Sequence, residues 1–131
     1  MDIRVGFGFD VHQLKDGRDF WLGGIIIPHL KGGLGHSDAD VLVHTICDAL
    51  LGAANLGDIG KHFPDNDMRY KGIDSKILLH SVMNLIRDKG YEVGNIDSTI
   101  CLEKPKIAPH IKEMKKVLAS CMKIEKDLIS I

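Results

Sequence analysis

Alternating apolar and polar residues predict a strand at residues 2–9. The apolar positions on one face are Ile3, Val5, Phe7 and Phe9. Gly6 and Gly8 take positions on the opposite face, which indicates a close approach of the backbone to another element. A polar turn at 13–19 leads to a second strand region at 20–28, and the pair Gly23–Gly24 is expected to interrupt it.

Three later segments have the apolar spacing of helices. The first is predicted over 39–55, after a Gly-rich loop at 31–38, and Ser37 with Asp40 matches a capping box at its start. The second is predicted over 75–89, with Asp74–Ser75 as the cap and Gly90 as the end. The third is predicted over 107–122. The loop at 56–67 has little apolar content, and functional residues are often found in such loops.

The remaining pattern predicts a strand over 91–102, a turn at 103–106 and the beginning of another strand at 127–131. The order β-β-α-α-β-α-β predicts an α+β fold, a single-domain α/β sandwich with the sheet on one side and the helices on the other. We expect residues 1–131 to form one catalytic domain. Because a domain seldom ends where a strand begins, we also expect the natural protein to continue beyond Ile131.

Composition narrows the possible functions. The chain of 131 residues has 17 Lys and Arg against 18 Asp and Glu, so it lacks the basic field that attracts nucleic acid. No apolar run approaches the roughly 18 residues of a membrane span. The start lacks signal-peptide character, and a cytoplasmic, bacterial protein is expected. With three cysteines and no C-x-x-C pair, a disulfide framework is not expected, and Cys47 and Cys101 are predicted to be buried packing residues.

One set of side chains indicates metal chemistry. Asp10 and His12 are two residues apart in an extended stretch, so both side chains point to the same face. His44 lies on the first predicted helix. One carboxylate and two imidazoles form a three-ligand set for Zn²⁺ that leaves one coordination position open, as catalytic sites do. On the same helix face, Asp40 is assigned a structural role, and Asp48 a role beside the ligand imidazoles or the substrate.

The order and spacing of several motifs resemble the 2-C-methyl-D-erythritol 2,4-cyclodiphosphate synthase family. The matching segments are Gly6–His12, His36–His44, Asp48–Ala54, Gly57–Gly60 and Phe63–Asp65. The similarity extends through Lys71–Gly72, Lys89–Tyr91, Gly94–Asn95 and Pro105–Lys106, and so covers essentially the whole chain.

The resemblance implies a step of non-mevalonate isoprenoid biosynthesis. The 2-phosphate of 4-diphosphocytidyl-2-C-methyl-D-erythritol 2-phosphate attacks the β-phosphorus, and CMP is released as a cyclic diphosphate forms. It also implies a homotrimer with active sites between neighbouring subunits, helices outside and sheets toward the threefold axis. This is phosphorus-oxygen lyase chemistry, with no role for nucleic acid or a membrane.

The resemblance also assigns roles to residues of this chain. Asp10, His12 and His44 become the Zn²⁺ ligands, and Asp10 and His12 also face the substrate. His36 would stabilise the transition state, and both His36 and Ser37 would contact the substrate phosphate. The remaining substrate-binding positions are Asp58, Ile59 and Gly60; Phe63, Pro64, Asp65, Asn66 and Asp67; and Leu102, Glu103, Lys104, Pro105, Lys106, Ile107 and Ala108, the last group around the cytidine.

The family also carries a Thr-Thr-x-Glu motif on a strand that would follow residue 131. Its Glu would bind a second ion, Mg²⁺ or Mn²⁺, with the substrate phosphates. The C-terminal strand and helix of the family are therefore expected outside residues 1–131. Phe7 stands where the family often has His, and Glu103–Lys104 also departs from the family pattern.

The chemistry is consistent with the residues. Phosphoryl transfer depends on positioning and charge neutralisation, and the substrate itself supplies the nucleophile. We expect His36 and the N–H groups at the start of the 39–55 helix to face the phosphates. Two alternatives stay open: a metal-dependent nucleotide or phosphoester hydrolase on the same scaffold, and a non-catalytic trimer in which Zn²⁺ only supports folding.

Overall fold

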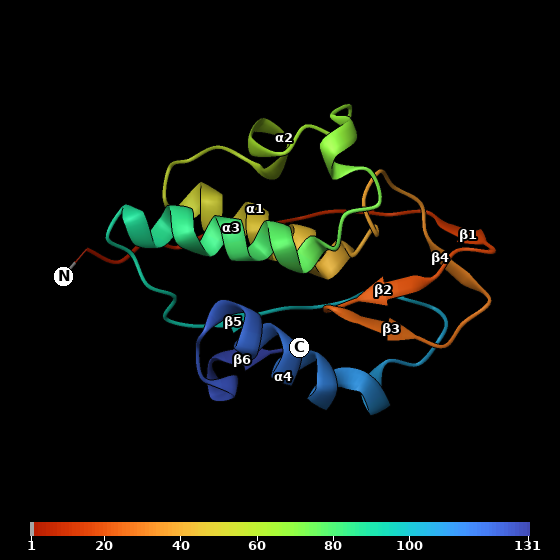
Figure 1. The fold of residues 1–131 in the computed structure, drawn as a ribbon. Coiled ribbons are helices and arrows are strands. Elements are labelled where there is room, and N and C mark those ends of the chain that lie inside the picture. Colours follow the sequence, from red (N-terminus) through yellow and green to blue (C-terminus); the bar gives the residue numbers. More distant parts are fainter. Residues whose placement is uncertain (1) are drawn as a thin grey trace.

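Two helices that lie side by side form the centre of the molecule (Figure 1). The computed structural model describes residues 2–131. Helices α1 (Val41–Ala53) and α3 (Ser75–Asp88) pack against each other, and α4 (Ile111–Met122) packs on α3. The short helix α2 (Ile59–His62) contacts α1 and lies on the side of the pair away from α4.

The strands are short and form three separate pairs. β1 (Leu14–Asp16) pairs antiparallel with β4 (Lys31–Gly33), and β2 (Phe20–Leu22) pairs antiparallel with β3 (Ile25–Ile27). β5 (Ile96–Asp97) pairs parallel with β6 (Ile129–Ser130). Single 3₁₀ turns are formed by Met68–Tyr70 (η1), Ala108–His110 (η2) and Lys126–Leu128 (η3).

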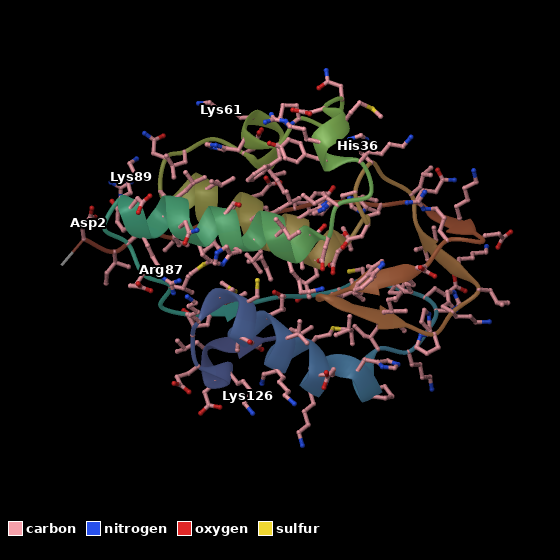
Figure 2. The ribbon with its side chains drawn as sticks, in the orientation of Figure 1. Asp2, His36, Lys61, Arg87, Lys89 and Lys126 are labelled. Atoms are coloured by element: carbon pink, nitrogen blue, oxygen red, sulfur yellow. The ribbon has the colours of Figure 1, made fainter. Side chains whose placement is uncertain are left out.

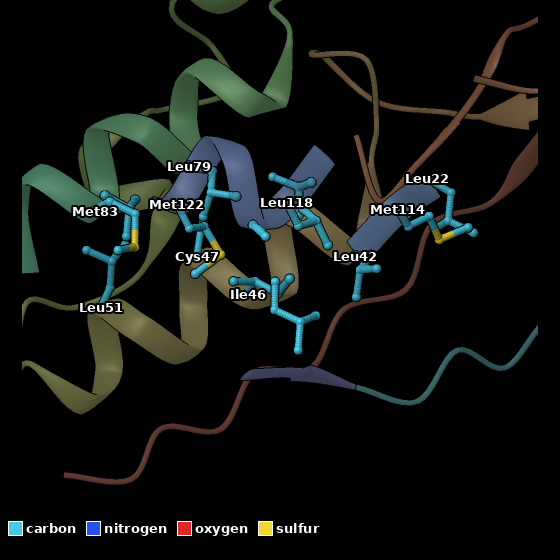
Figure 3. Packing of buried hydrophobic residues seen from close by; sticks show 14 of the residues in the cluster. Leu22, Leu42, Ile46, Cys47, Leu51, Leu79, Met83, Met114, Leu118 and Met122 are labelled. Atoms are coloured by element: carbon cyan, nitrogen blue, oxygen red, sulfur yellow. The ribbon is translucent and has the colours of Figure 1, made fainter. Parts of the chain in front are cut away.

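The hydrophobic core lies where α1, α3 and α4 meet the β2–β3 hairpin (Figure 3). Its fully buried side chains include Leu22, Val43, Cys47, Leu51, Leu79, Val82, Met83, Met114, Leu118 and Met122. They recur at three- and four-residue spacing on the helices, so each helix turns one apolar face inward. The face of α1 that carries His44 is outside this cluster and is available for chemistry.

The predicted strand at 2–9 is wrong for the described chain. The segment is extended but has no strand partner within residues 2–131. Ile3, Val5, Phe7 and Phe9 share a face as expected, yet each is at least 75% exposed. The predicted close approach of the glycines is confirmed, because a Cβ on Gly6 would lie 1.9 Å from the Ala49 carbonyl oxygen of α1.

The start of α1 also differs from the prediction. The helix begins at Val41, its N-cap is Asp40, and Ala39 before it has a positive φ of 62°. The side chain of Asp40 accepts a hydrogen bond from the Val43 N–H, so it fills the position that the sequence assigned to Ser37. Ser37 instead remains in the loop, with its hydroxyl oxygen accepting from the Ala39 N–H at 3.2 Å.

Other predictions were right in part. The polar turn at 13–19 contains β1, the Gly-rich loop at 31–38 contains β4, and the loop at 56–67 contains α2. Only two residues of the predicted strand at 91–102 are paired, and helix 107–122 begins with η2 before α4. Cys47 is buried, but Cys101 is exposed, so its predicted packing role is wrong.

Several predictions are confirmed. The Gly23–Gly24 pair forms the turn of the β2–β3 hairpin, and both residues have positive φ. α3 begins after Asp74, which caps it, and Gly90 follows its end with a φ of 89°. A strand begins near the end of the chain as β6. None of the described helices has the length and apolarity needed to cross a bilayer.

Candidate metal centre

Asp10, His12 and His44 meet at one point of the structure. Each offers one ligand atom, and the three atoms lie within 4.8 Å of one another. Asp10 and His12 come from the extended N-terminal segment, and His44 comes from the first turn of α1. The two rings are 5.2 Å apart between centroids and nearly perpendicular, with an interplanar angle of 70°. The grouping predicted from the sequence is therefore present.

A hydrogen bond on its far side orients the ring of His12. Its Nδ1 lies 2.7 Å from the carbonyl oxygen of Ala39, and since a carbonyl only accepts, Nδ1 carries the proton. In the neutral ring, Nε2 then presents a lone pair at 3.0 Å from Oδ2 of Asp10. Two acceptors at that distance repel each other unless a cation lies between them, which is the arrangement of a metal site.

The ring of His44 turns its other nitrogen toward Asp10 than the ring of His12 does. Its Nδ1 faces Asp10, with 3.9 Å between Nδ1 and Oδ2, and its Nε2 faces the hydroxyl of Ser75 at 2.8 Å. Burial lowers the pKa of His44, and the nearby His12 lowers it further. Both effects favour the neutral imidazole, which is the form that binds a metal ion.

The donor set fits a catalytic Zn²⁺ better than a structural one. One carboxylate oxygen and two imidazole nitrogens are ordinary zinc ligands, and three protein ligands leave a position for substrate or water. The side chains are partly accessible, with 29% exposure for Asp10 and 14% for His44. An incoming phosphate could therefore reach the site.

His36 connects the candidate site to the neighbouring loop. Its Nε2 lies 2.8 Å from the backbone oxygen of Asp67, so the ring donates to the end of the 63–67 loop. Figure 2 shows His36 beside the turn that contains η1. Ser37 is buried, and its hydroxyl oxygen lies 3.1 Å from Nε2 of His44. Of the two predicted phosphate contacts, Ser37 therefore lies beside His44, and His36 contacts the 63–67 loop.

The segment 58–60 is held against α1 by an acidic side chain. Asp48, one helical turn after His44, accepts a hydrogen bond from the Ile59 N–H at 2.8 Å. Asp58 caps α2 by accepting from the Lys61 N–H at 2.9 Å, and Gly60 lies within the helix. Burial raises the pKa of Asp48, with the nearby Asp58 and Asp10 as smaller contributions. Asp48 is therefore a partner of the 58–60 segment in this structure.

The loop at 63–67 folds between α2 and η1. The ring of Phe63 packs edge-on against Tyr70, with 5.5 Å between centroids. Asp67 caps η1 and pairs with the exposed Arg69 at 2.7 Å. This pair, mainly through its hydrogen bonds, lowers the pKa of the Asp67 carboxyl. Pro64, Asp65 and Asn66 form the intervening turn.

The segment 102–108 leads from the strand region β5 to α4. In Figure 1 it runs beside the β2–β3 hairpin toward α4, whereas α2 and η1 lie across the helix pair. Leu102 and Ile107 are partly buried against the core. The other members are Glu103, Lys104, Pro105, Lys106 and Ala108. The segment assigned to the cytidine and helix α2 therefore lie on opposite sides of the helix pair in Figure 1.

The sequence did not predict all the contacts of three residues near the site, which are Asp40, Ser75 and Asp38. Asp40 was given a structural role, but its contacts with the Gly23 and Gly24 N–H groups, at 3.0 and 2.7 Å, join α1 to the hairpin. Its carboxylate also accepts from the Val43 N–H at the start of α1, so this one donor is occupied, and the expectation that N–H groups there face the phosphates stays a prediction. Ser75 and Asp38 were not assigned to the site. No local pattern marks them, because they are 37 residues apart in the chain.

Comparison with known proteins gives one consistent family. The YgbB family pattern matches residues 3–131. A curated relative from Bacteroides fragilis, named 2-C-methyl-D-erythritol 2,4-cyclodiphosphate synthase, is 66% identical over 131 residues, which are 100% of this chain and 82% of the relative. A relative of the same name from Porphyromonas gingivalis is 61% identical over 129 residues, covering 98% of this chain and 80% of its own length.

The similarity extends to solved structures. A 2C-methyl-D-erythritol-2,4-cyclodiphosphate synthase in a CDP-bound form superposes with a TM-score of 0.86 at 38% identity. The match covers 97% of this chain and 85% of that one. Both the sequence and the fold of residues 2–131 are therefore similar to those of proteins with that name.

Proposed function

Because the chain belongs to the YgbB family and its relatives are 2-C-methyl-D-erythritol 2,4-cyclodiphosphate synthases, we propose that it catalyses this cyclisation in isoprenoid biosynthesis. The substrate is 4-diphosphocytidyl-2-C-methyl-D-erythritol 2-phosphate. An oxygen of its 2-phosphate forms a bond to the β-phosphorus, and the bond from that phosphorus to the bridging oxygen of CMP breaks. The products are 2-C-methyl-D-erythritol 2,4-cyclodiphosphate and CMP, and the reaction belongs to the bacterial cytoplasm.

The observation that carries the proposal is the convergence of Asp10, His12 and His44, with two rings oriented for a cation. A Zn²⁺ held there would polarise a phosphate oxygen and offset its charge. The protein residues fix the imidazole orientations and leave one side of the group accessible. A second divalent ion, Mg²⁺ or Mn²⁺, is proposed to accompany the substrate phosphates.

Positioning accounts for the remaining catalytic residues. His36 is proposed to stabilise the charge on the phosphate oxygens in the transition state, and Ser37 to hold the same group. The segment Asp58–Gly60 and the loop Phe63–Asp67 are proposed to hold the sugar and methylerythritol parts. Holding both reacting phosphates makes the attack effectively unimolecular.

A homotrimer with active sites between subunits is part of the proposal. Residues 102–108 and helix α2 lie on opposite sides of the helix pair in Figure 1. The 102–108 segment of one subunit is proposed to bind the cytidine above the metal ligands of its neighbour. The exposed apolar row Ile3, Val5, Phe7 and Phe9 supports such an assembly, because a surface of this kind is normally covered.

The hydrolase alternative gains no support from the relatives, which carry the synthase name. The nature of the product distinguishes the two activities. Purified protein would be incubated with the diphosphocytidyl substrate, Zn²⁺ and Mg²⁺, and followed by phosphorus NMR. We expect CMP together with a cyclic diphosphate. CMP with an open-chain phosphate would contradict the cyclisation, and no conversion would contradict the proposed activity of this chain.

A further inference from the structure

The strongest unassigned feature is a chain of hydrogen bonds behind His44. Nε2 of His44 lies 2.8 Å from the hydroxyl oxygen of Ser75, the first residue of α3. That hydroxyl lies 2.5 Å from Oδ1 of Asp38. Ser75 is fully buried, so water does not compete for its hydroxyl. The three side chains come from α1, from α3 and from the loop between β4 and α1.

The protons in this chain have one consistent arrangement. A carboxylate at Asp38 only accepts, so the Ser75 hydroxyl donates its single proton to Oδ1. The lone pairs of that hydroxyl are then left to accept from His44, which requires the proton of the neutral ring on Nε2. The lone pair of His44 therefore lies on Nδ1, the nitrogen that faces Asp10.

Asp38 is itself held in place by two backbone groups. Its Oδ2 accepts from the Ser75 N–H at 2.9 Å, and its Oδ1 accepts from the Asp40 N–H at 3.1 Å. One carboxylate thus joins the start of α3 to the start of α1 immediately behind the ligand. Fixed acceptors on both sides limit the rotation of Asp38 and of the Ser75 side chain.

We propose that Ser75 and Asp38 are positioning residues that fix the His44 ring with Nδ1 free for the metal. This inference rests on the proposed metal-dependent function and adds residues to it. Hydrogen-bond partners of metal-bound imidazoles set the tautomer and the direction of the ring, and their loss commonly lowers metal affinity by 10- to 100-fold. Ser37 also lies near Nε2, at 3.1 Å, but its oxygen accepts from the Ala39 N–H and it is the longer contact.

The test is the Zn²⁺ affinity of the whole chain, measured by competition with a chromophoric chelator. We expect Ser75→Ala to weaken Zn²⁺ binding by about 10- to 100-fold. Asp38→Asn should weaken it less, because the hydroxyl of Ser75 remains. Ser81→Ala is the matched control, since it removes a hydroxyl from the same helix at a position that does not contact His44, and should leave the affinity unchanged. His44→Ala sets the affinity of a chain without this ligand.

A second measurement does not depend on the folding of any variant. Long-range proton–nitrogen NMR of the metal-free parent chain should show His44 protonated at Nε2 alone. Parent affinity in Ser75→Ala, or a parent His44 protonated at Nδ1, would overturn the inference. A loss in Ser37→Ala with none in Ser75→Ala would overturn it as well. The proposed metal site itself fails only if the parent binds Zn²⁺ no better than His44→Ala.

Discussion

The imidazoles of the two proposed metal ligands, His12 and His44, are held by groups of different kinds. His12 donates to a backbone carbonyl, that of Ala39, a residue with a positive φ. His44 faces two hydroxyls. The sequence could predict that these side chains come together, because Asp10 and His12 alternate along an extended segment and His44 lies on a helix. Their supporting partners depend on contacts between distant residues, and so the sequence did not predict them.

Asp40 is the most deeply buried charged group near the site. Burial raises its pKa from 3.8 to about 6, against the opposing effect of three backbone N–H donors. Between pH 3.8 and about pH 6, Asp40 keeps its proton in the folded chain and has released it in the unfolded chain. The stability that Asp40 contributes is therefore complete below about pH 4 and is lost as the pH rises through 6.

The predicted consequence concerns the free energy of unfolding of the parent and of Asp40→Asn. The parent should lose up to about 3 kcal/mol relative to Asp40→Asn between pH 4 and pH 7, because only the parent titrates at this position. Urea unfolding of the metal-free proteins at several pH values measures this difference. A parent that gains stability relative to the variant as pH rises would show that the N–H donors outweigh burial.

The N-terminal segment carries Asp10 and His12, two of the three proposed ligands, although it pairs with no strand among residues 2–131. It is held against α1 by the close approach of glycines, and a Cβ on Gly8 would lie 2.1 Å from the Thr45 carbonyl oxygen. The apolar alternation correctly predicted an extended chain there. It could not supply a pairing partner, which depends on a second segment.

Gly8→Ala should therefore displace the segment from α1 and move Asp10 and His12 away from His44. We expect at least a tenfold loss of Zn²⁺ affinity, as for loss of a supporting contact. Gly52→Ala is the control, since a Cβ at Gly52 meets nothing within 4 Å. Alanine is also more favourable than glycine within a helix by up to about 1 kcal/mol. Chelator competition and thermal melting measure both effects, and equal Zn²⁺ affinity in the two variants would refute this role of Gly8.

The contact between α1 and α2 connects the metal ligands to the proposed substrate segment. Asp48→Ala removes the acceptor of the Ile59 N–H and should loosen residues 58–60. If residues 58–60 bind substrate, KM should rise about tenfold, with a smaller change in kcat. A tenfold change corresponds to the loss of one hydrogen bond to a charged group. Steady-state kinetics on the cyclisation decide this, and a fall in kcat with an unchanged KM would instead place Asp48 at the reacting groups.

At the level of the assembly, the alternating apolar row is the main surface that the single chain leaves uncovered. Phe7 is 84% exposed and Val5 is 90% exposed. Such a row on extended backbone is typical of a sheet face that packs in an oligomer. Sequence patterning predicted which residues share this face, but burial of the face depends on neighbouring segments and subunits.

Phe7→Glu should disrupt the proposed trimer, because a charge would be buried in an apolar interface. Sedimentation velocity should show the parent at the mass of three chains and the variant at a lower mass. Ile77→Glu is the matched control, since Ile77 is an apolar residue of α3 with 56% exposure outside this row. A parent that sediments as a single chain, or a variant that remains trimeric, would argue against this interface.

The most direct test of the account is the metal dependence of turnover. Chelated protein would receive Zn²⁺ stepwise, with Mg²⁺ and the diphosphocytidyl substrate in excess, while phosphorus NMR follows the cyclic diphosphate. We predict that turnover rises with added Zn²⁺ and saturates at one ion per chain, and that His44→Ala stays inactive throughout. Full turnover by the chelated protein, or by His44→Ala, would contradict the assignment of Asp10, His12 and His44 as the catalytic metal site.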